Sequence, residues 1–214
     1  MEKVQDRLSN LMEVIQSRRS VRHYDPTAKI SKEELLEILK EATLAPSSSN
    51  LQPWRFLVID DQAQKEKLLP IANHQQQVVD SSAVIAVLGD LQSYENAEKI
   101  YGSQVEAGFM TEEIKEVLLR NSNNLYPNLD EATRAKIAYI DGGLVSMQLM
   151  LVAKARGYDT VPMGGYNAAQ FIEAFHVPER FFPVMLIAVG KASKPGNRTT
   201  RLPIEDVTFW NDMK

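Results

Sequence analysis

The chain has 214 residues, with 24 Lys and Arg against 28 Asp and Glu, a formal net charge of -4 and no cysteine. This length allows one domain with a substantial core, and the absence of cysteine excludes disulfides, thiolate nucleophiles and cysteine-ligated zinc. The acidic balance does not suit a nucleic-acid binder, and neither a signal-peptide core nor an apolar run approaching the roughly 20 residues of a membrane span is evident, so we expect a cytoplasmic protein.

An arginine cluster follows an amphipathic segment at the N-terminus. A helical stripe is predicted from the spacing of Val4, Leu8, Leu11 and Ile15. It leads into Ser17-Arg18-Arg19-Ser20-Val21-Arg22, where guanidinium forks beside a hydroxyl fit phosphate or carboxylate oxygens. A solvated surface turn is the alternative interpretation of such a short basic run.

A polar loop follows the second predicted helix. That helix is expected to begin at Ser31, because Ser31 and Glu34 form a capping-box pattern before an apolar stripe. The loop from Ala45 to Trp54 is bracketed by Pro46 and Pro53, and prolines hold their predecessors extended. The pattern therefore indicates either a stiff segment that presents hydroxyl and amide side chains, or a plain connector.

The middle of the chain alternates between predicted strands and helices. Apolar, β-branched or aromatic runs predict strands over 54–59, 83–88, 158–162 and 182–189, and helices are expected over 64–73 and 168–175. The interval from 90 to 130 is charged, carries several aromatic residues and predicts one or two peripheral helices. These helices could cover a site or cover the sheet.

The longest helical pattern spans residues 131–156. It is apolar nearly all round, so we expect it to be central, with Met147 and Met150 as core filler. The pair Gly142-Gly143 costs about 1 kcal/mol per residue relative to Ala, which suggests that another backbone packs closely there.

The remaining chemistry favours a bound phosphorylated cofactor over a nucleophile carried by the protein. Gly164-Gly165 follows a predicted strand and either admits a ligand close to the backbone or forms an ordinary turn. None of His23, His74 and His176 has a partner at metal-ligand spacing, so no metal site is expected. The chain also lacks the G-x-G-x-x-G pattern of a Rossmann domain.

Taken together, these motifs resemble the FMN-dependent nitroreductase family. The resemblance rests on Arg18-Arg19-Ser20-Val21-Arg22, on residues 45–54, on Pro162-Met163-Gly164-Gly165-Tyr166 and on Arg201, in that order along essentially the whole chain. It implies a single α+β domain over residues 1–214, with a central, mostly antiparallel sheet flanked by helices, in an intertwined homodimer. Residues 90–130 would form a lid-like peripheral excursion, and the tail from 191 to 214 would reach the partner subunit.

The resemblance also implies roles for the basic residues at an FMN site. Arg18 and Ser20 would hold the FMN phosphate, helped by Arg201 and Arg198, and Arg19 would lie along the ribityl chain. Arg22 would face the N1 and C2 carbonyl edge of the ring, where a fixed positive charge stabilises the reduced flavin.

The other implied contacts surround the flavin ring. Pro46, Ser47, Ser48 and Asn50 would come from the partner subunit, while Met163, Gly164 and Gly165 would bring a backbone N–H to flavin N5. An amide is expected at the N3 and O4 edge, and the candidates are Asn73, Gln75 and Gln77. The chain departs from many relatives in having Gly164 where they carry Glu, and Thr199 and Thr200 before its last arginine.

The function implied is an FMN-dependent NAD(P)H oxidoreductase that reduces nitroaromatics, quinones or similar small electron-poor acceptors by a ping-pong mechanism. The flavin carries the chemistry, so no catalytic side chain is expected. The alternatives are a specialised flavin enzyme of the same fold, either a reductive dehalogenase or a flavin-degrading enzyme, and a non-catalytic FMN-binding protein.

Overall fold

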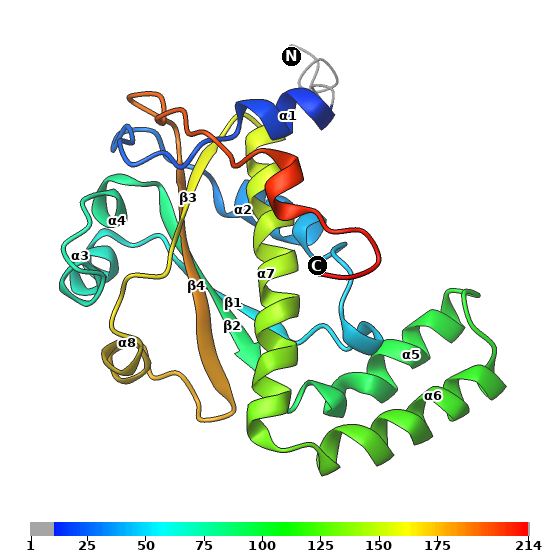
Figure 1. Ribbon diagram of the computed structural model, residues 1–214. Helices are drawn as coiled ribbons and strands as arrows, with labels where there is room; N and C mark the ends of the chain where they lie inside the picture. Colours follow the sequence, from blue (N-terminus) through cyan, green and yellow to red (C-terminus); the bar gives the residue numbers. More distant parts are fainter. Residues whose placement is uncertain (1–10, 214) are drawn as a thin grey trace.

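A four-stranded antiparallel sheet lies at the centre of the computed structural model, which describes residues 11–213 (Figure 1). The strands are β1 (Trp54–Ile59), β2 (Ala83–Asp90), β3 (Asp159–Met163) and β4 (Phe181–Gly190), in the spatial order β1-β2-β4-β3. All four predicted strands are present, with ends that differ from the prediction by at most two residues. The expected antiparallel sheet is confirmed.

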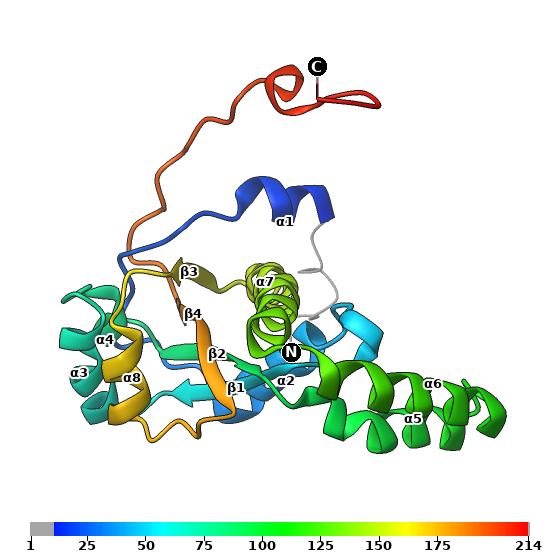
Figure 2. The ribbon, with the colours of Figure 1, turned by 60° about the horizontal axis from the view of Figure 1, so that its bottom comes forward.

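Helices cover both faces of this sheet (Figures 1 and 2). Alternate residues of β2 point to opposite faces, so Ile85 and Val87 pack in one cluster while Val84 and Ala86 pack in the other. The first face is covered by α2 (Lys32–Ala42) and α7 (Glu131–Ala155), and the second by α3 (Gln62–Ile71), α4 (Gln77–Asp80) and α8 (Ala168–Ala174). Because both faces are covered, β2 is buried along its whole length.

The predicted capping box at the start of α2 is only half formed. Ser31 Oγ accepts a hydrogen bond from the Glu34 backbone N–H at 3.2 Å. The Glu34 carboxylate instead pairs with Arg156, whose guanidinium also makes a two-pronged contact with Glu41 at 2.6 and 2.9 Å. These ion pairs tie the C-terminal end of α7 to α2.

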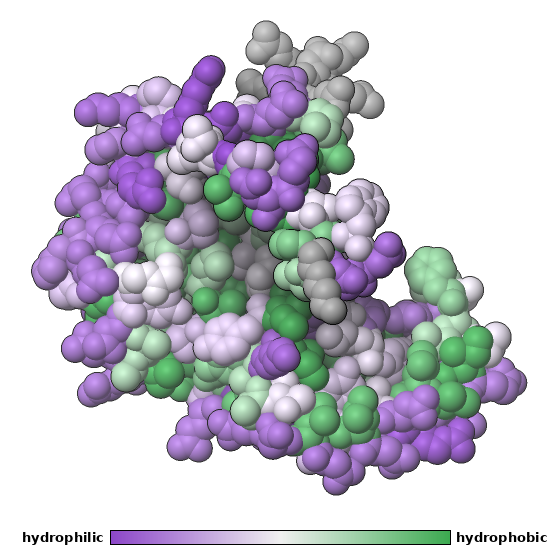
Figure 3. Space-filling view, in the orientation of Figure 1, coloured by the Kyte–Doolittle hydropathy of each residue, from purple (hydrophilic) through white to green (hydrophobic). Residues whose placement is uncertain are grey.

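One stripe of α7 is left largely exposed by residues 11–213. Val145 and Leu149 are fully buried, whereas Ile140, Leu144 and Met147 are 56%, 44% and 39% exposed. The expectation that Met147 fills the core is therefore wrong for this chain, although Met150 is buried. In Figure 3 apolar surface lines the hollow beside this helix.

The glycine pair in α7 is explained by a side chain and not, as predicted, by another backbone. A Cβ at Gly142 would lie 3.0 Å from Cγ1 of Val184 on β4, so glycine lets the helix approach the sheet. A Cβ at Gly143 would meet nothing within 4 Å. Close packing therefore accounts for the first glycine only.

By length and composition α7 could cross a bilayer, although no such run was expected from the sequence. It packs against β2 and β4 through its buried stripe, as a core helix does. We therefore describe it as the central helix of the fold.

The interval between β2 and α7 forms a helical hairpin, which we call the helical arm. It comprises a short turn (Ser93–Asn96), α5 (Ala97–Glu106), α6 (Glu112–Leu125) and a second short turn (Tyr126–Asn128). The predicted helices are present, but they project away from the sheet and do not cover it (Figures 1 and 2).

A buried carboxylate fixes the base of this arm. Asp90, at the end of β2, is 2% exposed and accepts hydrogen bonds from Arg55 at 2.8 Å and from Arg180 at 2.9 Å through two of its nitrogens. Arg180 also reaches Glu95 in the first turn of the arm at 3.1 Å. Two arginines compensate the cost of burying one carboxylate and hold β1, β2 and the arm together.

The two ends of the described chain lie apart from the sheet. Helix α1 (Leu11–Ser17) is present, while Val4 and Leu8 of its predicted stripe lie outside the described residues. The tail from 197 to 213 is exposed throughout, and its only regular element is a short turn at Ile204–Val207. Figure 2 shows this tail standing away from the body of the molecule.

We predict that Arg156→Ala lowers the free energy of unfolding by about 1–2 kcal/mol, because a two-pronged charged contact is lost. The hydrogen bond from Arg156 holds the pKa of Glu41 below its ordinary 4.5, so this contribution is present above pH 4.5 and is lost as the pH falls. Urea unfolding at several pH values measures both effects.

The matched control is Lys40→Ala, which removes an exposed pair with Glu37 on the same helix and should change stability by less than ~0.5 kcal/mol. Equal losses in the two variants would contradict a structural role for the contact between α7 and α2.

Candidate functional site

The segment from Arg18 to Arg22, which we call the Arg–Ser segment, lies along the outer edge of β3. Ser20 pairs with Thr160 in a parallel bridge, and the Val21 N–H donates to the Thr160 carbonyl at 3.1 Å. Because β3 is an edge strand, its free backbone groups are available to this segment. The sheet edge thereby fixes where the arginines stand.

The three arginines of this segment have different surroundings. Arg19 turns back and donates to the carbonyls of Gln16 and Arg18 at 2.6 and 2.7 Å. Arg18 is half-buried and Arg22 is exposed, and neither forms an ion pair with a carboxylate of residues 11–213. Two guanidiniums without a carboxylate partner leave this end of β3 ready to bind an anion.

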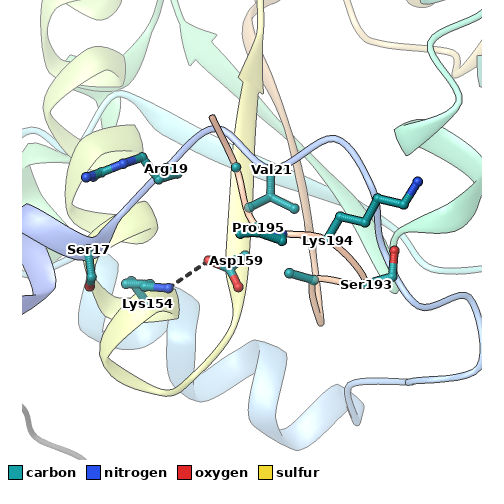
Figure 4. A pocket seen from close by; sticks show the side chains of 10 residues that line it. Ser17, Arg19, Val21, Lys154, Asp159, Ser193, Lys194 and Pro195 are labelled. Atoms are coloured by element: carbon teal, nitrogen blue, oxygen red, sulfur yellow. Dashed lines mark hydrogen bonds and ion pairs between the residues drawn. The ribbon is translucent and has the colours of Figure 1, made fainter. Parts of the chain in front are cut away.

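The start of the tail packs against the same segment. The Ser193 N–H donates to the His23 carbonyl at 2.9 Å. A Cβ at Gly196 would stand 2.6 Å from the Arg19 Cβ, so only glycine allows this approach. A cavity of about 290 Å³ opens beside the contact, and Figure 4 shows Lys154 paired with Asp159 in its wall.

The tail arginines are placed differently from each other. Arg198 lies two residues beyond Gly196, and so follows directly on the contact with the Arg–Ser segment. Arg201 stands farther along the exposed tail, where its guanidinium donates to Thr199 Oγ1 at 2.7 Å and to the Thr200 carbonyl at 2.8 Å. Within the described chain no hydrogen bond joins Arg201 to Arg18 or Ser20.

The other end of β3 leads into Gly164-Gly165, the Gly turn. Asn73 Nδ2 and Gln75 Nε2 donate to the Gly165 carbonyl at 2.9 and 3.0 Å. A Cβ at Gly164 would meet nothing within 4 Å, so the space in front of the turn is open. The structure thus brings together two candidate groups that are 90 residues apart in sequence.

Two of the three candidate amides, Gln75 and Gln77, are hydrogen-bonded to each other, and Asn73 shares the Gly165 carbonyl with Gln75. Gln77 is 5% exposed and donates to Gln75 Oε1 at 2.9 Å and to the Met163 sulfur at 3.5 Å. Gln77 therefore supports Gln75, and the side chains of Asn73 and Gln75 are the ones that a ligand at the turn can reach.

A buried lysine secures the element that carries these amides. Lys65 is fully buried, and its ammonium donates to the carbonyls of Val79 and Ser81 at 3.1 and 2.6 Å, at the C-terminal end of α4. Burial lowers the pKa of Lys65 below its ordinary value. A cation suits the exposed carbonyls of a helix end, so this contact anchors the segment from 73 to 80.

The spacing of the two ends of β3 defines an elongated site. Ser20 lies opposite Thr160, and Met163 and Gly165 follow three and five residues later. At ~3.3 Å per residue along a strand, Ser20 and Met163 at the end of β3 stand roughly 10 Å apart, and the Gly turn lies beyond Met163. This arrangement suits a long ligand with an anionic end and a polar, hydrogen-bonding end.

Residues 46–52, the serine loop, lie elsewhere. In both Figures 1 and 2, α7 stands between this loop and β3. Ser48 donates to Asp141 of α7 through its backbone N–H at 2.9 Å and through its hydroxyl at 3.3 Å. Pro46, Ser47, Ser48 and Asn50 are thus brought together, but the chain does not bring them to the Arg–Ser segment.

The serine loop has an unusual backbone. Ser49, Asn50 and Gln52 have φ of 51°, 53° and 49°, in the left-handed region that non-glycine residues seldom adopt. Each such residue costs on the order of 1 kcal/mol and persists only where its surroundings enforce the conformation. The partners enforcing it were not predicted from the sequence, and they include Asp141, Tyr101 and Tyr126.

Asp141 could have been found from the sequence. It is the sole charged residue between Ile137 and Ala153, in an otherwise apolar helix, and a charge in such a position needs a partner. It is 2% exposed, and burial raises its pKa above the ordinary 3.8, against the opposing effect of the two hydrogen bonds from Ser48. No comparable sequence pattern marks Tyr101 or Tyr126 as partners of the loop.

Among residues 11–213 no three His, Asp or Glu side chains are grouped as a metal site would need. The recognisable chemistry of this chain is thus its anion-binding arginines, its Gly turn and its amides.

Comparison with known proteins decides the family. The model of the nitroreductase family matches residues 15–191. The chain belongs to the nitroreductase family. The resemblance seen in its motifs is therefore confirmed, and the antiparallel sheet flanked by helices is the nitroreductase fold.

Three relatives illustrate this membership. "Putative NAD(P)H nitroreductase YdgI" of Bacillus subtilis is 50% identical over 94% of this chain and 98% of its own length. A crystal structure from Exiguobacterium sibiricum, described as a "putative nitroreductase in complex with FMN", is 49% identical, with a TM-score of 0.92 over 95% of this chain and 98% of that one. The "CLA biosynthesis enone reductase" of Lactiplantibacillus plantarum is 36% identical over 90% of each chain.

We predict a pH-dependent effect of Asp141→Asn. Because the folded state holds the Asp141 proton more tightly than the unfolded chain does, this residue lowers the free energy of unfolding as the pH rises from 3.8 through its raised pKa. The variant has no carboxyl to ionise at this position. Its free energy of unfolding relative to the wild type should therefore increase between about pH 3 and pH 7 in urea unfolding.

Asp130→Asn is the control with the opposite sign. Hydrogen bonds from Thr133 lower the pKa of Asp130, so its stabilisation is present above pH 3.8 and the variant should lose stability relative to the wild type as the pH rises. Parallel curves for Asp141→Asn and the wild type would contradict the assignment of Asp141.

Proposed function

We propose that the chain is an FMN-dependent NAD(P)H oxidoreductase that reduces small electron-poor acceptors. The observation that carries the proposal is an alignment along β3. Arg18 and Arg22, which have no carboxylate partner in the described chain, lie beside this strand, and the open Gly turn follows its end. An anionic group at one end and a hydrogen-bonding ring edge at the other are the two ends of FMN. Family membership and the FMN in the Exiguobacterium relative support the same conclusion.

The residues of the Arg–Ser segment divide the binding work. Arg18 and Ser20 hold the phosphate, and Arg198 and Arg201 of the tail add further positive charge. Arg19 borders the ribityl chain, although its guanidinium also bonds to backbone carbonyls. Arg22 supplies a fixed positive charge at the N1 and C2 carbonyl edge of the ring, where negative charge develops.

The Gly turn and the amides hold the opposite edge. Met163 ends β3, and the backbone of Gly164 and Gly165 lies open for a ligand to approach flavin N5. Asn73 and Gln75, supported by Gln77, meet the N3 and O4 edge. FMN, when bound, takes hydride from NAD(P)H and passes electrons to the acceptor, so the protein provides orientation and charge.

A homodimer completes the site. Within the described part of the chain, the stripe of α7 and four apolar side chains of the tail stay exposed: Leu202, Ile204, Phe209 and Trp210. A groove of about 640 Å³ between α2, β1 and α5 is lined by apolar side chains such as Leu39, Trp54 and Phe56 and provides a place for a partner's tail. A partner subunit would also bring its serine loop, including Pro46, Ser47, Ser48 and Asn50, to the flavin.

The acceptor is proposed to be a nitroaromatic or a quinone. A conjugated enone is a second candidate, because the enone reductase of Lactiplantibacillus plantarum covers the same length at 36% identity. In either case NAD(P)H reduces the protein, and the two candidates differ only in the acceptor that enters the open site. The helical arm would border that space as a lid.

We predict that the purified protein carries FMN and that NAD(P)H bleaches the flavin absorbance under anaerobic conditions. Arg18→Ala should weaken FMN binding about tenfold or more, as expected when a charged hydrogen bond is lost. Arg22→Ala should retain FMN and lower its reduction potential on the order of tens of millivolts, because a fixed positive charge is removed. Flavin titration and potentiometry measure these effects.

Arg120→Ala provides the matched control, since Arg120 is an exposed arginine of the helical arm. It should change neither quantity. A wild-type protein that binds no FMN would contradict the proposed function, and bound FMN that NAD(P)H cannot reduce would favour a non-catalytic flavin protein. Turnover of nitroaromatics, quinones and enones by the reduced protein then separates the candidate acceptors.

We further predict that Leu144→Glu converts the dimer to a monomer and reduces FMN retention, because a charge would be buried in the interface formed by α7. Light scattering after size-exclusion chromatography measures the mass. Ile114→Glu, a similar change at an exposed residue of the helical arm, should leave the mass unchanged. A monomeric wild type, or a dimeric Leu144→Glu variant, would contradict the assigned interface.

A further inference from the structure

The serine loop is fixed by groups from two different elements. On the side of α7, the Asp141 carboxylate receives the two hydrogen bonds from Ser48. On the side of the helical arm, the Tyr101 hydroxyl donates to the Ser49 carbonyl at 2.8 Å, and the Tyr126 hydroxyl donates to Ser49 Oγ at 2.9 Å. Ser49 is thus held from the arm at the first residue of the loop with a left-handed backbone.

The two tyrosines are themselves rigidly placed. Tyr101 on α5 is 2% exposed and Tyr126, after α6, is 6% exposed. The Tyr101 oxygen also lies 3.3 Å from the hydroxyl oxygen of Ser122, which is itself buried. Both rings belong to a small apolar cluster that contains Leu51 of the serine loop, so the loop is packed into the arm as well as hydrogen-bonded to it.

These contacts hold Ser49, which lies between two residues assigned to the flavin site. Ser48 and Asn50, the residues on either side of Ser49, are those that the proposed dimer brings to the flavin. The φ of 51° at Ser49 sets the direction in which the next side chains leave the backbone. A hydrogen bond to the carbonyl and another to the hydroxyl of the same residue restrict both its peptide plane and its side chain.

We propose that Tyr101 and Tyr126 are positioning residues of the flavin site, which act through Ser49 to hold Ser48 and Asn50 in the geometry that meets the FMN of the partner subunit. This inference rests on the proposed function. It makes the helical arm part of the cofactor site, since one hydroxyl comes from α5 and the other from the turn after α6.

Phenylalanine substitutions test the inference with little change in packing. Tyr101→Phe, Tyr126→Phe and the double variant each keep the ring and remove a hydroxyl. Tyr94→Phe is the matched control, because Tyr94 stacks on Tyr126 within the same cluster and its hydroxyl makes no hydrogen bond recorded among residues 11–213. Four quantities are measured for each protein: its mass, its thermal midpoint without FMN, its FMN dissociation constant and the absorbance maximum of its bound flavin.

The expected result separates positioning from stability. Each single variant should bind FMN roughly three- to tenfold more weakly, as expected for the loss of one hydrogen bond, and the double variant more weakly still. The flavin maximum should shift because the polar groups around the ring have moved. Backbone amides of the serine loop should exchange hydrogen faster in these variants, while exchange in the Arg–Ser segment stays unchanged.

Two results would overturn the inference. One is an FMN affinity and a flavin spectrum equal to the wild type in the tyrosine variants, which, with a lower thermal midpoint, would make the contacts purely structural. The other is an equal loss of affinity in Tyr94→Phe, which would assign the effect to the apolar cluster. If the double variant does not fold, the two single variants decide on the same criteria.

This outcome is distinguishable from failure of the proposed function. If the wild type binds no FMN, the flavin proposal fails before any variant is compared. If the wild type, Tyr94→Phe, Tyr101→Phe and Tyr126→Phe all bind FMN with the same affinity, the flavin proposal stands. The positioning role of the two tyrosines is then rejected.

Discussion

Helix α7 has two apolar stripes and only one sheet to pack against. The rest of the molecule depends on which stripe packs on the sheet and what covers the other. The stripe with Val145 and Leu149 is buried on the sheet, and Gly142 lets the helix approach Val184 closely. The stripe with Ile140, Leu144 and Met147 remains open. Exposed apolar area of this kind is costly in water, which favours a second copy of the chain as its cover.

The same helix divides the functional groups into two sets. The Arg–Ser segment, the Gly turn and the amides gather along β3, whereas the serine loop stands beyond α7, where Asp141 holds Ser48. A dimer that buries the open stripe of α7 could place the serine loop of one chain against the groups along β3 of its partner. Assembly and cofactor binding would then be linked, because the interface and the site share one helix.

Buried polar groups in this fold act where segments must be held without regular secondary structure. Asp90 gathers Arg55 and Arg180 at the base of the helical arm, Lys65 binds the carbonyls after α4, and Asp141 with the two tyrosines holds the serine loop. In each case the burial of a polar group is compensated by hydrogen bonds. These contacts hold the base of the helical arm, the segment that carries the amides and the serine loop in fixed positions.

The sequence by itself determined the local elements and the kind of ligand. Periodicity and β-branched runs predicted four strands to within two residues, and the Arg–Ser, proline-bracketed and glycine motifs predicted the family. Only the tertiary structure decided which groups meet. Hydrogen bonds such as that of Tyr101 with Ser49, or the pairing of Arg180 with Asp90, join residues 52 and 90 positions apart, and no local pattern records them. The open stripe of α7 was likewise hidden, because an apolar helix has the same sequence pattern whether its second side meets its own sheet or another chain.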